Sequence, residues 1–219
     1  MTLLEAYHRL DEAWGPQHWW PGESVLEIMV GAVLTQNTAW SNVERAIANL
    51  KAAGALSMQA LLALPLDELA ALIRPAGYFN VKARRLRALL EWVSAAGGVE
   101  ALSGWTDEKL RSGLLGVHGV GPETADDILL YAFERPVFVI DAYTRRILGR
   151  LGLIDPTMGY EHLRAMIEAE LSPDVPLFNQ FHALLVAHGK AICRPRPRCT
   201  VCVLREGCPA ATPTRLPPE

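Results

Sequence analysis

The chain has 219 residues, half of them hydrophobic, with 21 Lys and Arg against 24 Asp and Glu. This length and apolar content are enough for one large or two small domains with a packed core, and no apolar run reaches the roughly 20 residues that a membrane-spanning helix needs. The formal net charge of −3 argues by itself against a nucleic-acid partner, although such binding depends only on a local basic face.

The first part of the chain is predicted to be helical. Apolar residues recur with helical spacing over Leu3–Trp14, Val25–Leu34 and about Ser41–Ala53. The first segment carries acidic and polar residues early, so we expect no signal peptide, no membrane partner and a cytoplasmic protein. Trp19 and Trp20 lie in the loop before the second helix. Burial is the default for such residues, but adjacent tryptophans in a loop are also suited to stacking on a flat base.

The middle of the chain alternates short helices with turns. A polar cluster, residues 35–38, ends the second helix, and two short helices separated near Pro65 follow over residues 56–73. The turn at residues 74–80 leads into a predicted helix over Val81–Ala95. The first half of that helix carries four basic residues and no acid, which indicates either a basic binding face or an ordinary solvated one: Lys82, Arg84, Arg85 and Arg87.

A Gly-rich turn between two predicted helices is the most informative stretch. Gly119 and Gly121 permit positive φ angles and the close approach of another molecule to the backbone. Pro122 suits the first position of a helix, and the N–H groups of such a turn form a small anion site. Asp141 follows directly behind an apolar run, Val137–Ile140.

The remaining predicted elements are helices as well. Val137–Ile140 is the only strand-like run, and four residues do not make a sheet. We therefore predict an all-α fold. The further helices expected are Asp107–Leu115, Thr124–Phe133, Ala142–Leu151, Tyr160–Leu171 and Pro176–Ala187.

All four cysteines fall near the C-terminus in a C-x5-C-x2-C-x5-C pattern: Cys193, Cys199, Cys202 and Cys208. In a cytoplasmic protein, metal ligation explains such a cluster better than disulfides do. Four thiolates suit either Zn²⁺ or a [4Fe–4S] cluster, and spacing alone decides poorly. In the first loop Arg194, Arg196 and Arg198 alternate with prolines, which predicts a stiff phosphate-binding loop with outward-pointing arginines.

The hairpin followed by Asp141, and the cysteines behind His188-Gly189-Lys190, resemble the endonuclease III superfamily of DNA glycosylases. Its members carry a helix-hairpin-helix followed by Gly/Pro and Asp. The resemblance covers most of the chain and implies two helical domains with a DNA cleft between them. Residues 22–133 would form a helical-barrel domain with the hairpin, and residues 1–21 plus 134–219 a helical iron–sulfur domain.

The resemblance also implies a cofactor and a partner. The family's C-x6-C-x2-C-x5-C pattern binds a [4Fe–4S] cluster, and this chain is one residue shorter in the first gap. The expected partner is double-stranded damaged DNA, bound by a nucleoid-associated monomer. The cluster is expected to be structural, holding the arginine loop for DNA contact.

Individual roles carry over by position. Asp141 matches the family's catalytic carboxylate, which stabilises the oxocarbenium-like sugar; an N-cap is its alternative role. Gln36 matches the residue that fills the gap left by the flipped base, and Tyr78 the apolar wedge that enters the duplex. The backbone of Gly119 and Gly121 is expected to contact DNA.

The chief departure from the family is Glu123. Bifunctional members have Lys there, whose amine forms a Schiff base with the sugar, and a carboxylate cannot do so. We therefore expect a monofunctional glycosylase that uses water, and AP-lyase activity is doubtful.

Among the branches of the superfamily, the stretches 19–21 and 31–38 together with Glu123 look most like 3-methyladenine DNA glycosylase III, although that branch commonly lacks the cysteines. Alkylated purines are cationic and good leaving groups, and an aromatic pocket suits a flat cation. Oxidised or mismatched pyrimidines are the alternative substrate. A catalytically weak DNA-binding homologue is the second alternative, favoured by the missing Lys and the acidic net charge. The base pocket expected from the resemblance comprises Trp19, Trp20, Gln36, Glu123 and Lys190.

Overall fold

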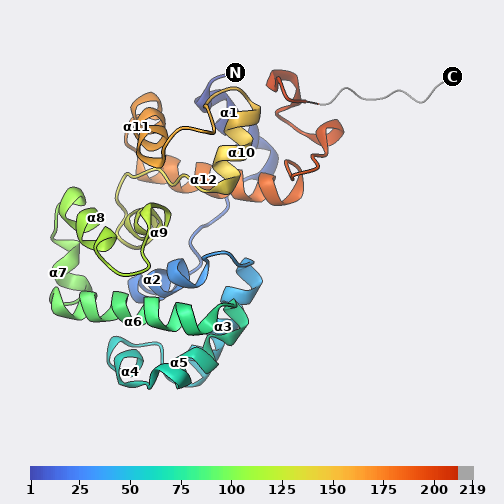
Figure 1. Cartoon of the computed structure of the whole chain (residues 1–219). Helices are drawn as coiled ribbons and strands as arrows, with labels where there is room; N and C mark the ends of the chain where they lie inside the picture. The colour runs from blue at the N-terminus through green and yellow to red at the C-terminus, as the bar shows by residue number, and fades with distance from the viewer. Residues whose placement is uncertain (212–219) are drawn as a thin grey trace. The chain divides into compact units, whose positions relative to one another are not determined.

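The structure, a computed structural model, describes residues 1–211 (Figure 1). All regular secondary structure in this range is helical, which confirms the all-α prediction. The chain forms two compact units: Trp20–Arg135, here called the hairpin unit, and Met1–Trp19 with the chain from Pro136 onward, here called the cysteine unit. The boundaries expected from the sequence lay at residues 22 and 133. None of the described helices is long and apolar enough to cross a membrane.

The hairpin unit is built around α2 (Val25–Leu34). This helix is apolar nearly all round and is buried along most of its length, because α3, α6 and η2 pack against it. The predicted second helix of the hairpin begins at Pro122, two residues earlier than expected, and continues as a π-helix. The other elements of this unit are α3 (Trp40–Ala52), α4 (Met58–Ala63), α5 (Leu66–Leu72), η1 (Arg74–Ala76), α6 (Phe79–Ala95), α7 (Val99–Ser103), α8 (Asp107–Leu115), α9 (Pro122–Asp127) and the π-helix η2 (Ile128–Ala132).

The cysteine unit is built around α12 (Val175–Ala191), against which α1 and α10 pack. Its core holds Phe138, whose ring meets those of Phe178 and Phe181 edge-on at 5.4 and 5.8 Å. The remaining elements are α1 (Leu3–Trp14), α10 (Ala142–Arg150), α11 (Tyr160–Leu171), η3 (Cys199–Val201) and η4 (Arg205–Gly207).

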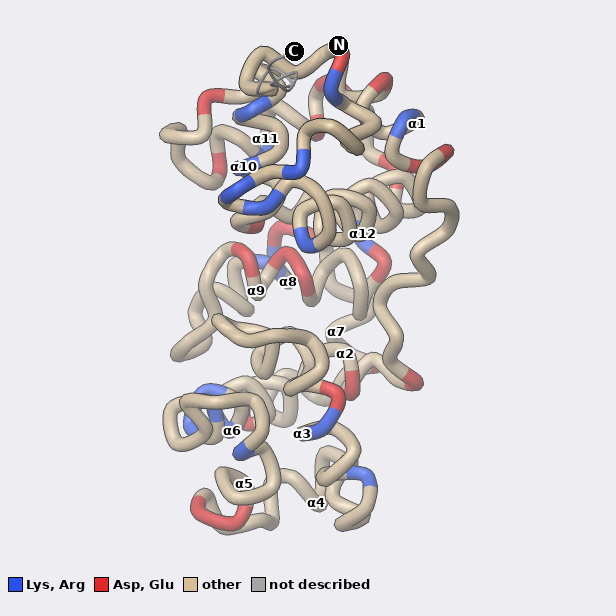
Figure 2. Tube along the Cα trace, turned by 90° about the vertical axis from the view of Figure 1, so that its right-hand side faces the viewer, with Lys and Arg blue, Asp and Glu red and all other residues tan. Residues whose placement is uncertain are grey.

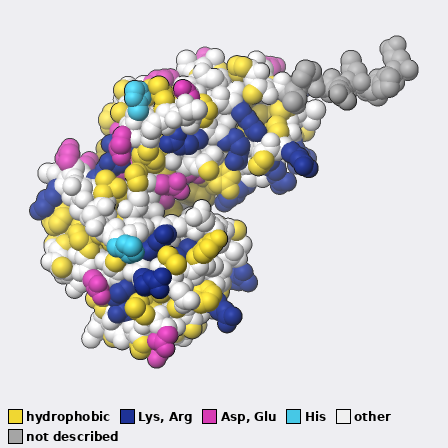
Figure 3. All heavy atoms as spheres, viewed as in Figure 1, with side chains coloured by type: hydrophobic (Ala, Val, Ile, Leu, Met, Phe, Trp, Pro, Cys, Tyr) yellow, Lys and Arg dark blue, Asp and Glu magenta, His cyan; other side chains and the backbone are white. Residues whose placement is uncertain are grey.

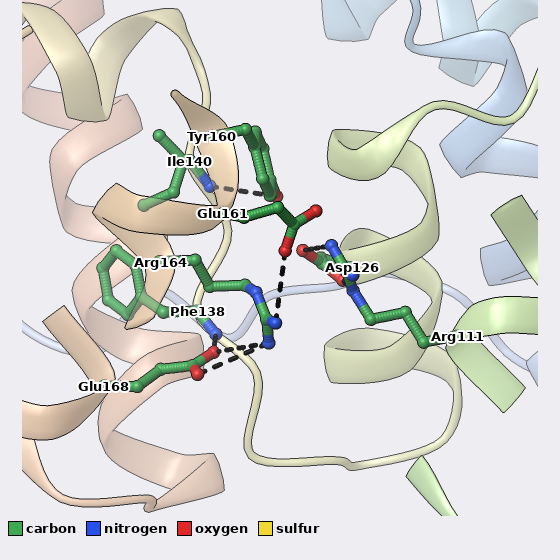
Figure 4. A network of polar contacts seen from close by, with 8 residues as sticks. All are labelled: Arg111, Asp126, Phe138, Ile140, Tyr160, Glu161, Arg164 and Glu168. Carbon is green, nitrogen blue, oxygen red and sulfur yellow. Dashed lines mark hydrogen bonds and ion pairs between the residues drawn. The ribbon is translucent and has the colours of Figure 1, made fainter. Parts of the chain in front are cut away.

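The apolar run Val137–Ile140 is extended and buried but pairs with no strand in the described chain. Side chains of α11 satisfy its backbone instead: the Phe138 N–H donates to Glu168 Oε1 at 2.9 Å, and the Ile140 N–H to Tyr160 Oη at 3.4 Å (Figure 4). Arg164 holds the Glu168 carboxylate in place at 3.2 Å. The run therefore delivers Asp141 to the start of α10 without a sheet.

The basic segment of α6 is not the solvent-facing cluster that the sequence suggested. Lys82 is only 1% exposed, and its Nζ donates to the carbonyls of Leu34 at 2.9 Å and Ala76 at 2.7 Å. Arg87 is half-buried and donates to carbonyls at the end of α4. These two charges satisfy free carbonyls at helix ends, so they are not available to a nucleic acid.

Candidate functional site

Asp141 is the N-cap of α10. Its Oδ1 accepts the Thr144 N–H at 2.7 Å, and its Oδ2 lies 3.6 Å from His182 Nε2 on α12. Burial by itself would raise the pKa of this carboxyl, but the nearby His182 ring and the hydrogen bond from the Thr144 amide lower it overall. The side chain is 13% exposed. Asp141 is therefore an oriented carboxylate that stays ionised at neutral pH, because its pKa is lowered.

Two of the predicted base-pocket residues lie near this carboxylate within the cysteine unit. The Trp19 ring meets the His182 ring edge-on, with centroids 6.0 Å apart, and Lys190 Nζ lies 5.6 Å from the centre of the Trp19 ring. The series Lys190, Trp19, His182, Asp141 thus forms one cluster. The sequence did not single out His182, because a lone histidine on an apolar helix face is usually only a core residue.

Gln36 fastens the hairpin to the end of α2. Its Nε2 donates to the Gly119 carbonyl and to Thr124 Oγ1, both at 3.0 Å, while its Oε1 accepts from Arg85 Nη1 at 2.6 Å. The Arg85 stem also covers Gly119, where a Cβ would lie 2.2 Å from Arg85 Cγ. The hairpin is therefore held by a side-chain network contributed by α2, α6 and α9.

The two glycines of the hairpin differ. Gly119 has φ of 86°, but Gly121 has φ of −93° and is the N-cap of α9, so only Gly119 uses the positive φ that a glycine permits. A Cβ on Gly121 would meet no atom within 4 Å. Glu123 is exposed in the first turn of α9, where a negative charge is favourable because of the helix dipole.

Tyr78 stands out as an exposed aromatic residue in a strained conformation. It is the N-cap of α6, with φ of 45° and ψ of 33°, and it is 72% exposed. A left-handed conformation costs about 1 kcal/mol or more for a residue with a bulky side chain. Such strain is often found where a side chain has a function, which makes Tyr78 a candidate contact residue.

Trp20 belongs to the hairpin unit, unlike its neighbour Trp19. Its ring lies 5.2 Å from that of Trp40, edge-on, and 5.3 Å from that of Tyr131. Trp20 and Trp40 line a pocket of about 200 Å³ together with Pro21, Glu27, Glu44, Ile47, Ala48 and Lys51. Tryptophan faces beside carboxylates form a suitable environment for a flat cation. Of the five expected base-pocket residues, this pocket holds Trp20.

The four cysteines line one common pocket. Burial, followed by repulsion from the neighbouring thiols, raises the pKa of Cys202 and Cys208, so thiolates here need positive charge nearby. Arg150 supplies positive charge here, because its Nη1 lies 3.3 Å from Cys193 Sγ. Among the described residues, no three His, Cys, Asp or Glu side chains converge closely enough to hold a single metal ion. A cubane cluster gives each thiolate an iron of its own, so the four cysteines of this pocket provide the kind and number of ligands that such a group takes.

Two arginines of α10 hold the loop between the first two cysteines. Arg146 Nε donates to the Cys193 carbonyl at 2.8 Å, and Arg150 donates to the carbonyls of Arg194 at 2.6 Å and Pro195 at 3.0 Å. The sequence did not indicate this role for Arg146 and Arg150. It becomes visible only when α10 and the loop are brought together.

The three arginines of the loop, Arg194, Arg196 and Arg198, are all exposed, as expected from the sequence. Arg194 Nε also donates to the Lys190 carbonyl at 2.7 Å. Figure 2 marks several Lys and Arg positions in blue on the trace near the C-terminal part of the chain, and Figure 3 shows Lys and Arg side chains gathered near that part in its view. The local basic face that nucleic-acid binding needs is therefore present despite the acidic net charge.

Comparison with known proteins identifies the family of this chain. The family model described as HhH-GPD superfamily base excision DNA repair protein matches residues 30–173. A protein of Methanocaldococcus jannaschii, provisionally named a DNA repair glycosylase, is 43% identical over 94% of this chain and 95% of its own length. Endonuclease III of Sulfolobus acidocaldarius is 29% identical over 84% of this chain and 82% of its own length.

Solved structures agree in fold. The 3-methyladenine DNA glycosylase MagIII of H. pylori, bound to 1,N6-ethenoadenine, superposes with a TM-score of 0.76 at 28% identity, covering 87% of this chain and 98% of that one. An endonuclease III–DNA complex gives a TM-score of 0.82 at 20% identity over 96% and 97% of the two chains, which shows the common fold. The chain therefore belongs to the HhH-GPD superfamily and is a DNA glycosylase of base excision repair.

Proposed function

We propose that this protein is a monofunctional glycosylase that removes alkylated purines of the 3-methyladenine type from DNA. The observation that carries the proposal is Asp141, an ionised carboxylate held at a helix N-terminus by Thr144 and His182. When the bond between C1′ and the base nitrogen breaks, positive charge develops on the sugar. A fixed anion beside C1′ stabilises that charge, and water then forms the new bond to C1′.

We base the absence of a Schiff-base step on Glu123. By the resemblance to the family, this residue matches the position at which bifunctional members carry the reactive amine, and its carboxylate is exposed in the first turn of α9. A carboxylate cannot form an imine with the opened sugar. The product should accordingly be an intact abasic strand.

Three observations support an alkylated purine as the substrate. N3- or N7-alkylation leaves the base cationic, so departure needs no protonation by the enzyme. The pocket beside Trp20 and Trp40 offers aromatic faces to a flat cation, with the carboxylate of Glu44 beside them and that of Glu27 paired with Lys51 at 3.0 Å. The similarity to MagIII, which is a 3-methyladenine glycosylase bound to a modified purine, points in the same direction.

Oxidised or mismatched pyrimidines are the second candidate substrate. The endonuclease III relatives, at 29% identity over more than four fifths of the chain, favour this alternative. The C-terminal cysteines also resemble those of that branch.

We further propose that Cys193, Cys199, Cys202 and Cys208 hold a [4Fe–4S] cluster. When bound, the cluster would supply positive charge to the thiolates and a rigid support for the arginine loop. Arg196 and Arg198 would then contact phosphates, as would the backbone at Gly119 and Gly121. Purified protein should contain about four irons per chain; one zinc and no iron would exclude this cofactor.

Two further residues are assigned to the duplex. Tyr78, exposed at the start of α6, would act as the wedge that separates bases, and Gln36 would face the gap left by the extruded base. We propose that Trp19 and Lys190, which belong to the same unit as Asp141, contact the extruded base.

Single-turnover release of bases from duplexes that carry one 3-methyladenine analogue, one ethenoadenine, one oxidised pyrimidine or one mismatch tests the proposal. The wild type should release the alkylated purine fastest, and borohydride should trap no adduct. Asp141→Asn keeps the N-cap but removes the charge, so the rate should fall on the order of 10²–10³-fold while DNA binding persists. Preferred release of a pyrimidine would reassign the substrate, and a trapped adduct would restore the lyase, with Lys190 the first amine to test.

A further inference from the structure

His188 is a buried histidine that the proposed catalytic steps do not use. It lies near the end of α12 and is 1% exposed. On one side, Trp14 Nε1 from α1 lies 3.4 Å from His188 Nδ1, and the two rings meet edge-on at 86°. On the other side, His188 Nε2 lies 3.3 Å from Cys202 Sγ. Both ring nitrogens are thus engaged.

The chemistry of these partners determines which nitrogen carries the proton. An indole N–H can only donate a hydrogen bond, so His188 Nδ1 must accept from Trp14. The ring is then neutral, with its proton on Nε2. Because Nε2 carries the hydrogen, His188 donates to the Cys202 sulfur. A contact from the N-terminal helix therefore fixes the direction of a hydrogen bond to a proposed cluster ligand.

A second donor reaches the cysteine pocket from another helix. Arg150 Nη1 lies 3.3 Å from Cys193 Sγ. Two of the four sulfurs thus accept N–H bonds from buried or half-buried side chains, His188 on α12 and Arg150 on α10. Hydrogen bonds to the sulfurs are among the factors that set the reduction potential of an iron–sulfur cluster.

We propose that His188 is a positioning residue of the iron–sulfur site: its Nε2–H bond to Cys202, held in one tautomer by Trp14, raises the reduction potential of the bound cluster. The inference rests on the proposed cluster. Adding an electron places more negative charge on the sulfurs, and a hydrogen-bond donor stabilises that reduced state more than the oxidised one. A merely structural histidine would fill the same space without this effect.

Spectroelectrochemical titration of the full-length, cluster-loaded protein tests the proposal, with the electrode supplying the electron. His188→Leu should shift the midpoint potential to a lower value. His188→Gln should have a midpoint potential close to that of the wild type, because a Gln Nε2 can also donate to the sulfur. Trp14→Phe keeps an aromatic ring but frees the tautomer, so a smaller shift in the same direction is expected. Trp105→Phe, in the hairpin unit, is the matched control and should leave the potential unchanged.

Equal potentials in the wild type and His188→Leu, both with full iron content, would overturn the inference and leave the cluster in place. If His188→Leu does not retain the cluster, Trp14→Phe decides: a lower potential supports the proposal, and an unchanged one contradicts it. A wild-type protein without iron would instead show that the proposed cofactor itself is wrong. Iron analysis before each titration separates these two failures.

Discussion

At the scale of single residues, Lys82 is an ammonium group buried inside the hairpin unit, where it bonds to the carbonyls of Leu34 and Ala76. Burial, followed by repulsion from Arg85, lowers the pKa of Lys82 to about 8. The unfolded chain keeps a value of about 10.4. The folded state therefore releases this proton at a lower pH than the unfolded state does.

A pH dependence of stability follows. Below pH 8 both states are protonated, and the buried charge reduces stability. Between pH 8 and about 10 the unfolded state binds more protons, so the free energy of unfolding should rise with pH. Across this window, the free energy of unfolding of the wild type should rise by up to about 3 kcal/mol relative to that of Lys82→Met. Urea unfolding of both proteins at several pH values measures the difference; a constant difference would mean that the two carbonyls keep Lys82 charged.

The carboxylate of Asp141 has the opposite shift. The groups that face it are His182 from α12 and the Thr144 amide from α10, and together they outweigh burial and lower its pKa. Base release should therefore stay constant as the pH falls until it passes below the ordinary Asp range near 4. In His182→Leu the ring that lowers the pKa of Asp141 is gone, so burial should raise this pKa. Base release should then begin to fall at a higher pH than in the wild type. Superimposable single-turnover profiles for the two proteins would show that His182 does not control this charge.

At the scale of elements, the hairpin offers a matched pair of substitutions. Gly119→Ala places a Cβ on a residue with positive φ, and this Cβ meets the Arg85 side chain. The substitution should therefore destabilise the protein by about 1–3 kcal/mol. Gly121→Ala meets open space at an ordinary φ and should unfold almost like the wild type. If DNA approaches this backbone closely, Gly121→Ala should nevertheless weaken binding to an abasic duplex. Unfolding and fluorescence anisotropy on both variants separate the two effects, and unchanged binding would contradict a close approach.

The loop between Cys193 and Cys199 depends on α10. Arg150→Met removes the bonds to the carbonyls of Arg194 and Pro195, so the loop should loosen and bind damaged and undamaged duplexes several-fold more weakly. Arg145→Met on the same helix is the control, because Arg145 bonds to the carbonyls of Pro156 and Met158 instead. Equal binding by the two variants would show that α10 does not support the DNA-binding loop.

At the scale of the whole molecule, an acidic protein binds a polyanion through a local basic face. Arg196→Ala or Arg198→Ala should weaken binding to damaged and undamaged duplexes alike and reduce the slope of log K against log salt by about 1. Arg9→Ala, an exposed arginine on α1, should change neither quantity. Dissociation constants measured at four or five salt concentrations provide the slopes. A loss confined to one lesion would show that the loop contacts the damaged base instead of phosphates.

Local pattern was sufficient for the helices themselves. The sequence predicted the bounds of α1, α2, α8 and α11 as the structure has them, because apolar periodicity and N-capping residues act within a few positions of one another. The resemblance to the family also singled out the hairpin, Asp141 and the four cysteines, and the roles of these residues stay predictions. The short α7 was not predicted, and neither was the π-helical form of Ile128–Ala132 within the predicted helix Thr124–Phe133, because neither has a distinctive local pattern.

Only the tertiary structure decided what the charged and polar side chains do. Lys82 and Arg87 belong to the same basic segment of α6 as Arg84, but they donate hydrogen bonds to carbonyls at the ends of other helices. His182 gains its place beside Asp141 only through the packing of α12 on α10. Trp19 and Trp20 are adjacent in sequence yet belong to different units. In each case the deciding partner lies far away along the chain, and a partner at that distance leaves no trace in local sequence.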